Sequence, residues 1–83
     1  MDEILIGEVS HYFNKIGVAV LNLSGEIVVG DKIHVTGYTT DFYQEITSLQ
    51  IEHQGVNEAH PGDDVALKVI ERVRHGDRVF KAS

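Results

Sequence analysis

The sequence feature that most constrains this chain is one turn signal that occurs three times. Each copy is a Gly-Asp pair, then one further residue, then a β-branched aliphatic residue. The copies are Gly30-Asp31-Lys32-Ile33, Gly62-Asp63-Asp64-Val65 and Gly76-Asp77-Arg78-Val79. Glycine adopts the positive φ that tight turns require, and an aspartate carboxylate can accept a backbone N–H where the next strand begins. Because the copies are unevenly spaced, they exclude a solenoid of fixed period. We interpret these aspartates as turn residues rather than metal or catalytic groups.

Between the turns the chain consists of short apolar runs, and no stretch combines a helical apolar period with a cap. The strand candidates are residues 4–9, 16–21, 27–29, 32–36, 42–53, 65–74 and 78–81. We therefore predict an all-β fold with little helix. The expected architecture is a small closed or nearly closed antiparallel β-barrel of about six or seven strands. Its 83 residues form a single domain, 1–83.

The segment 42–53 is the longest strand candidate, and its apolar residues change parity. Ile46 has even parity, whereas Leu49 and Ile51 have odd parity. If all three side chains point inward, one extra residue must lie near Thr47-Ser48. A β-bulge would supply that residue and also the local bend that a barrel needs.

The segment 65–74 separates apolar from cationic side chains by parity. Its inward set is Val65, Leu67, Val69 and Val73, and its outward set is Lys68, Arg72 and Arg74. Alternate residues of a strand lie about 6.6–6.8 Å apart, so one ligand could touch two guanidinium groups. The pattern predicts three cations in a row on the outer face.

The net charge of −6 is unevenly distributed. Residues 1–67 carry 2 basic and 11 acidic side chains, whereas residues 68–83 carry 5 basic and 2 acidic ones. Such an anionic chain disfavours general coating of nucleic acid. Two interpretations of the basic tail, which includes Arg78, remain open. It is either an ordinary exposed strand end or a small basic face that docks an acidic partner or an RNA end.

Aromatic side chains gather in two places, the first turn and the polar loop near residue 40. They are Tyr12, Phe13, Tyr38, Phe42 and Tyr43. Such rings either plug the open ends of a small barrel or stack on bases, and we favour plugging. Tyr43 is expected to be exposed, because Phe42 shares the parity of Ile46.

Several function classes are disfavoured by what the sequence lacks. There is no cysteine, which excludes disulfides and thiolate sites and fits a cytoplasmic location. No apolar run approaches the length of a membrane span, so no membrane association is expected. The five histidines show no metal-binding spacing, and no Gly-x-Ser-x-Gly elbow is present. We expect a noncatalytic protein without cofactor or metal.

The order of the motifs resembles the second domain of translational GTPases such as elongation factor Tu. The matching segments are Gly7-Glu8-Val9, 18–21, 29–33, 46–50, 59–67 and 73–79. The resemblance implies a β-barrel that associates with tRNA, the ribosome or a translation-related protein. It implies no GTP binding by this chain alone, because no Gly-x-x-x-x-Gly-Lys-Ser/Thr loop is present. A similar barrel resembles the small C-terminal domain of collagenase-like peptidases, which implies a peptidase-like partner.

The elongation-factor resemblance also points to particular residues. In that family the strand matching residues 49–53 helps to hold the aminoacylated end of tRNA through one acidic and one basic side chain. Here those positions are Gln50 and His53. Candidate contacts with a partner or RNA are therefore Lys68, Arg72, Arg74, Arg78, Gln50, His53 and Tyr43. The favoured function is a binding module of the translation apparatus, and the alternative is an accessory barrel subunit of a larger enzyme such as a collagenase-like peptidase.

Overall fold

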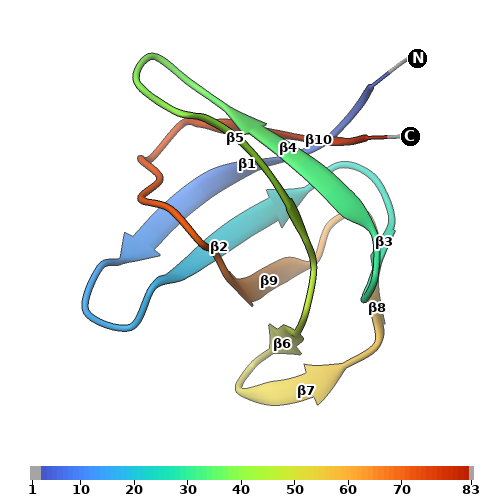
Figure 1. Ribbon diagram of the computed structural model, residues 1–83. Helices are drawn as coiled ribbons and strands as arrows, with labels where there is room; N and C mark the ends of the chain where they lie inside the picture. Colours follow the sequence, from blue (N-terminus) through green and yellow to red (C-terminus); the bar gives the residue numbers. More distant parts are fainter. Residues whose placement is uncertain (1–2, 83) are drawn as a thin grey trace.

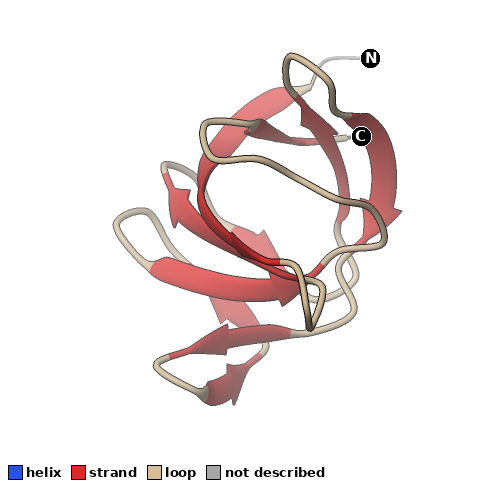
Figure 2. Ribbon diagram, turned by 90° about the vertical axis from the view of Figure 1, so that its left-hand side faces the viewer, coloured by secondary structure: helices blue, strands red, loops and turns tan. Residues whose placement is uncertain are grey.

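The computed structural model describes residues 3–82, and these residues form ten strands and no helix (Figures 1 and 2). The strands are β1 (Ile4–Phe13), β2 (Val18–Leu23), β3 (Ile27–Val28), β4 (Lys32–Thr36), β5 (Asp41–Glu45), β6 (Leu49–Ile51), β7 (Gln54–Val56), β8 (Glu58–Ala59), β9 (Asp64–Lys68) and β10 (Arg78–Lys81). One antiparallel sheet has the order β5-β4-β10-β1-β2-β9-β6-β7, and β3 pairs separately with β8. The described chain contains no helix long and apolar enough to cross a membrane.

The sheet curls about β1, which lies between β10 and β2 and pairs with them mainly through different halves. Its first half pairs with β10 and its second half with β2. Each pairing contains one extra residue on β1, Ile6 in the first and Ser10 in the second. A β-bulge of this kind bends its strand and increases the local twist. The two bulges thus supply curvature that the sequence led us to expect near Thr47-Ser48.

One edge strand of the curled sheet, β5, approaches the end of β9, which is an inner strand of the same sheet. The Gln44 side chain is only 8% exposed. Its amide nitrogen donates to the Lys68 carbonyl at 2.9 Å, and its amide oxygen accepts from the Ile70 N–H at 2.8 Å. One side chain therefore satisfies backbone groups that a neighbouring strand would otherwise pair. The predicted nearly closed antiparallel barrel is confirmed, and Figure 2 shows the strands wrapped around one interior.

The interior is filled by side chains from almost every strand. The buried apolar residues are Ile6, Val9, Ala19, Leu21, Leu23, Ile27, Ile33, Val35, Phe42, Ile46, Leu49, Ala59, Val65, Leu67, Val69, Val73 and Val79. The predicted inward set of the 65–74 segment is confirmed in full. Ile46 and Leu49 are also buried, and Ile51 packs against the same cluster. Alternation thus identified the core-facing side chains even where strand boundaries differ from the prediction.

The three Gly-Asp turns are built alike, as the sequence predicts. Gly30, Gly62 and Gly76 have φ values of 102°, 94° and 93°. In each turn the aspartate N–H donates to the carbonyl three residues earlier, and the aspartate carboxylate accepts from the N–H of that same residue. The second bond measures 2.9 Å in all three, from Val28 to Asp31, His60 to Asp63 and Arg74 to Asp77. We call these three turns the Gly-Asp corners.

Two strand predictions are wrong. The segment 42–53 is not one strand, because β5 ends at Glu45 and β6 begins at Leu49. The parity change at Ile46 therefore marks a break rather than a bulge. The segment 65–74 is likewise too long, since β9 ends at Lys68. The expected six or seven strands become ten because the barrel also uses pairs of two or three residues, such as β3 with β8 and β6 with β7.

Candidate binding surfaces

The prediction of three outward cations in a row on one strand is wrong, because Arg72 and Arg74 lie beyond the end of β9, although all three side chains are exposed. Lys68 is the last residue of β9 and lines a small depression of about 160 Å³ together with Gln50. Arg72 and Arg74 follow β9 and line a second depression. Arg78 lies on β10 and lines a third. Strand parity placed the cations correctly only while the strand continued, and it stops at residue 68.

Gln50 and His53 do not share the one strand that the sequence led us to expect. Gln50 is on β6, where it pairs with Gly55 of β7 and Ala66 of β9. His53 lies in the tight turn between β6 and β7, with a φ of 66°, and the preceding Glu52 has a φ of 51°. Both side chains are exposed. The continuous strand assumed for residues 49–53 therefore ends at Ile51.

The aromatic residues divide between core and surface. Phe42 is buried, and Tyr12 packs against the core cluster. Phe13, Tyr38 and Tyr43 are exposed. Only Phe42 and Tyr12 are thus placed to fill the barrel interior, as the favoured interpretation requires. The expected exposure of Tyr43 is confirmed.

A row of large side chains crosses the outer face of four strands. Register pairs Leu5 of β1 with Phe80 of β10, Phe80 with His34 of β4, and His34 with Tyr43 of β5. The His34 and Tyr43 rings stack with centroids 4.0 Å apart and planes inclined by 13°. The Lys32 ammonium lies 5.7 Å from the centre of the Tyr43 ring. These neighbours come from three distant stretches of sequence, so the alternation of residues 32–36 alone could not reveal the row.

His34 is the centre of a charged cluster that sequence reasoning missed. Its Nδ1 lies 2.7 Å from Oε1 of Glu3, and its Nε2 lies 2.6 Å from Oδ1 of Asp41. Tyr43 donates its hydroxyl to the other Glu3 oxygen at 3.0 Å. Ionised carboxylates only accept hydrogen bonds, so both ring nitrogens must carry a proton. With both carboxylates ionised, the two short contacts are satisfied together only by the protonated ring.

The pKa values of this cluster follow from its hydrogen bonds. Burial by itself lowers the pKa of His34, but hydrogen bonds to Asp41 and Glu3 outweigh burial and raise that pKa above its ordinary value. The hydrogen bond from His34 is the main cause that lowers the pKa of Glu3. The hydrogen bond to Glu3 raises the pKa of Tyr43. The cluster therefore favours one protonation state, a cation between two anions.

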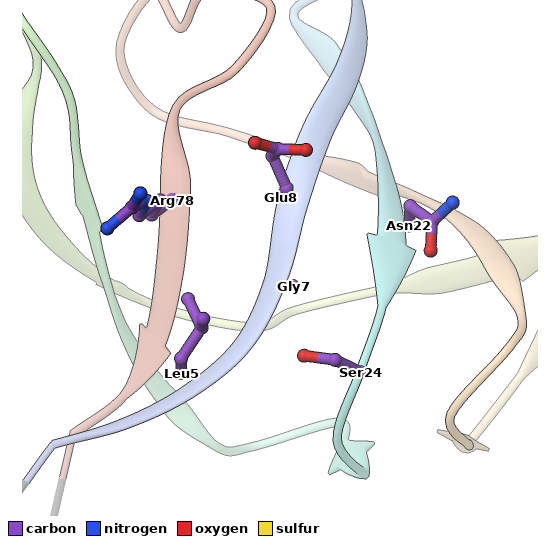
Figure 3. A pocket seen from close by; sticks show the side chains of 6 residues that line it. All are labelled: Leu5, Gly7, Glu8, Asn22, Ser24 and Arg78. Carbon is purple, nitrogen blue, oxygen red and sulfur yellow. The ribbon is translucent and has the colours of Figure 1, made fainter.

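A shallow depression of about 420 Å³ adjoins the Leu5 end of this row (Figure 3). It is lined by side chains of β10, β1 and the end of β2, namely Leu5, Gly7, Glu8, Asn22, Ser24 and Arg78. Gly7 leaves the floor open, and a Cβ there would lie 3.1 Å from the Asn22 carbonyl oxygen. The depression thus places the exposed Leu5 beside one carboxylate, one guanidinium and the neutral polar side chains of Asn22 and Ser24.

A second surface is formed by the β1–β2 hairpin, the β4–β5 turn and the segment after β9, which contacts both. We call it the hairpin end, and its exposed side chains are Phe13, Lys15, Ile16, Tyr38, Ile70, Arg72 and Arg74. A depression of about 420 Å³ runs between β1 and residues 72–75. Within residues 3–82 no group of histidine and acidic side chains is placed to hold a metal ion.

Comparison with known proteins links this chain to proteases. An uncharacterised protease of Methanocaldococcus jannaschii is 38% identical over 79 residues, which are 94% of this chain and 19% of that protein. Two collagenases of Porphyromonas gingivalis are each 35% identical, over 95% and 92% of this chain and 20% and 22% of their own length. The chain thus spans about a fifth of the curated relatives it matches. No family model matches it.

Solved structures show the same fold. Two crystal structures of the C-terminal domain of a Geobacillus thermoleovorans protein assigned to the U32 peptidases, one of them a selenomethionine variant, give TM-scores of 0.90 and 0.89 at 24% identity. They cover 98% and 93% of this chain, and the match covers 93% and 98% of those domains. At this identity the likeness establishes the fold alone.

The resemblance to translational GTPases is therefore wrong as an identification. The matched relatives are proteases and collagenases, and the matched structures are peptidase domains. The assignment failed because it rested largely on Gly-Asp corners, and such turns serve any small barrel that needs a tight reversal before a strand. The expectations of tRNA, ribosome and translation-factor partners, and the roles they gave to Gln50 and His53, fall with it.

Proposed function

We propose that this chain is a noncatalytic accessory barrel of a collagenase-like peptidase. Its surfaces would bind a peptidase-like partner. The observation that carries the proposal is the pattern of coverage. Relatives named as proteases or collagenases match this chain over more than nine-tenths of its length, yet the match occupies about a fifth of theirs. The rest of each relative has ample room for a separate catalytic part.

The geometry of the best charged cluster supports a binding role rather than catalysis. A general base needs a free lone pair within reach of the proton that it removes. Both nitrogens of His34 are occupied by the carboxylates of Glu3 and Asp41. Among residues 3–82, neither nitrogen is hydrogen-bonded to a serine or threonine hydroxyl. The cluster ties the start of the chain to β4 and β5 instead.

The proposal is tested by exchange with one of the relatives. The segment of a Porphyromonas gingivalis collagenase that matches this chain is either deleted or replaced by residues 1–83, and hydrolysis of labelled gelatin is measured. We expect the deletion to lose most of the activity and the replacement to recover it. This chain alone should not hydrolyse the substrate above the buffer rate.

Two outcomes would contradict the proposal. Gelatin hydrolysis by the purified chain would show that the barrel is itself catalytic. A replacement no more active than the deletion, despite correct folding by circular dichroism, would show that the barrel does not serve that enzyme. A cytoplasmic location, expected from the lack of cysteine, stays a prediction that fractionation can check.

A further inference from the structure

We propose that the hairpin end is a docking site for an acidic segment of a partner protein that also carries apolar side chains. The inference does not depend on the proposed function, because it follows from the charge and exposure of this surface. It goes beyond the collagenase-like role by naming where a partner binds and what chemistry it presents.

The hairpin end is held together by contacts between segments that are distant in sequence. The Val69 N–H donates to the Gly17 carbonyl at 2.9 Å, which holds the segment after β9 against the β1–β2 hairpin. The Arg74 Nε donates to the Thr39 hydroxyl at 3.0 Å, which ties that segment to the β4–β5 turn. Gln44 fixes the Ile70 backbone. The exposed side chains are therefore presented from a fixed framework.

Cations at this end have no acidic partners. Lys15, Arg72 and Arg74 take part in no ion pair within the described residues, where every ion pair involves His34, His60 or Lys81. Two acidic residues, Glu71, which is exposed, and Asp77, lie in the same segment, so this end has three cations against two acidic groups. Asp77 is only 4% exposed and accepts the Arg74 N–H. This end is thus locally positive in a chain whose net charge is −6.

The hairpin end also carries exposed apolar side chains. Ile16 and Ile70 are 60% and 68% exposed, and Phe13 and Tyr38 are exposed as well. None of these four lines the depression between β1 and residues 72–75, whose walls include Tyr12, Arg72 and Arg74. A surface that presents apolar side chains and unpaired cations is complementary to a ligand that presents apolar side chains and carboxylates.

The same observations favour a protein over RNA. A phosphate backbone carries a charge at every nucleotide and is repelled at long range by a strongly anionic chain. A protein segment can confine its few carboxylates to the positive end. Phe13 and Tyr38 could stack on bases as well as pack against a protein, so the choice of a protein rests on charge and on Ile16 and Ile70, which suit leucine or phenylalanine side chains.

The test is a nuclear magnetic resonance titration of the intact chain. The probe is a synthetic dodecapeptide in which pairs of glutamates alternate with leucines. Polyglutamate of equal length removes the apolar component, and an oligouridylate tests nucleic acid. We expect the dodecapeptide to shift amide resonances of residues 13–17 and 69–75, and each comparison ligand to bind at least about fivefold more weakly.

Matched variants locate the site. Lys15→Glu with Arg72→Glu should weaken peptide binding about tenfold or more. Lys32→Glu with Arg78→Glu changes the net charge equally but lies outside the hairpin end, and it should change affinity less than about twofold. Ile16→Ser with Ile70→Ser should weaken the dodecapeptide but leave binding of polyglutamate unchanged.

Several results would overturn the proposal. Equal weakening by the two charge-reversal pairs would mean that only net charge matters. Tighter binding of oligouridylate would assign the surface to nucleic acid. Concentration-dependent shifts at residues 13–17 and 58–64 without peptide would show that a second copy of the chain occupies the site. No shift at the hairpin end at millimolar peptide would exclude this class of ligand. None of these results depends on gelatin hydrolysis by the chimeric collagenase.

Discussion

The hairpin end and the region around β3 and β8 use the same turn but treat charge in opposite ways. Around β3 and β8, His60 lies 3.6 Å from Glu26 and 3.9 Å from Glu58, and Lys81 lies 3.4 Å from Asp31. At the hairpin end the third corner aspartate, Asp77, is buried under Gly37, while the surrounding cations have no ion-pair partner in the described part of the chain. Around β3 and β8, Lys81 and any protonated His60 thus have acidic neighbours, whereas the cations of the hairpin end have no ion-pair partner within residues 3–82, and these are the charges that we propose a ligand to pair.

The contrast separates two roles of one motif. At the open corners the aspartates are partly exposed. All three corners combine the local aspartate bonds with backbone bonds to a distant residue, which is Ile46, Leu23 or Val9. At the hairpin end the same aspartate also fills space between two loops, because its carboxylate occupies the position that a Cβ of Gly37 would take. The rigid, tightly packed layer therefore lies directly beneath the surface proposed to bind a partner.

The largest effect should come from filling that layer. A Cβ at Gly37 would lie 1.9 Å from an Asp77 carboxylate oxygen, so Gly37→Ala must displace a side chain fixed by the Arg74 N–H. We expect a loss of about 3 kcal/mol in the free energy of unfolding, measured with urea. Gly55→Ala is the control, because a Cβ there meets nothing within 4 Å. Equal losses in both variants would show that the hairpin end is not packed more tightly.

The next effect compares two corners directly. Asp77→Ala removes the acceptor of a partly buried N–H, whereas Asp63→Ala removes the acceptor of an exposed one. An unsatisfied group costs more when water cannot replace its partner, so we expect about 2 kcal/mol for Asp77→Ala and less than about 1 kcal/mol for Asp63→Ala. Thermal unfolding of both variants provides the comparison. Similar costs would contradict the distinction between buried and open corners.

A smaller effect is expected where Gln44 closes the barrel beside the hairpin end. Gln44→Ala loses the bonds to the Lys68 carbonyl and the Ile70 N–H, with an expected cost of about 1.5 kcal/mol. Hydrogen exchange should then accelerate at the Ile70 amide more than at amides of β1 and β2. Gln54→Ala, at an exposed position of β7, is the matched control. Unchanged exchange at Ile70 would show that the closure does not need this side chain.

The smallest effect is the pH dependence contributed by the His34 cluster. The pKa of His34 is raised from 6.5, so its contribution is complete below pH 6.5 and is lost as pH rises through the folded-state value. The pKa of Glu3 is lowered from 4.5, so its contribution is complete above pH 4.5 and is lost as pH falls through the folded-state value. Stability from this cluster should therefore be greatest between these two pH values.

The measurement is the urea midpoint of the chain and of His34→Gln over the range from pH 3 to pH 9. The protonated His34 ring donates to both carboxylates, and the variant has no such ring. In His34→Gln the urea midpoint should therefore lack the decreases that this cluster contributes at low and at high pH. An identical pH profile for the two proteins would mean that Glu3 and Asp41 do not hold the protonated ring.

Sequence reasoning succeeded where structure depends on neighbours in the chain. The positive φ of Gly30 is a local property, and the N–H and carboxylate of Asp31 both bond Val28, three positions earlier, so the motif itself predicts these features. Parity identified Val65 and Leu67 because side chains alternate along the extended backbone of β9. Val69 and Val73 are buried as well, although they lie beyond the end of that strand. Parity failed for Arg72 and Arg74, since nothing local marks Lys68 as the last residue of its strand.

The sequence by itself determined an all-β barrel, its three Gly-Asp corners and most of its core, since turn conformations and strand alternation are local properties. Only the tertiary structure decided which outward side chains meet. The contact of His34 with Glu3 requires β4 and β1 to flank β10, and the hairpin end requires Gly17 to receive the Val69 N–H. Such contacts join segments brought together by sheet order, which the pattern of any single strand does not encode.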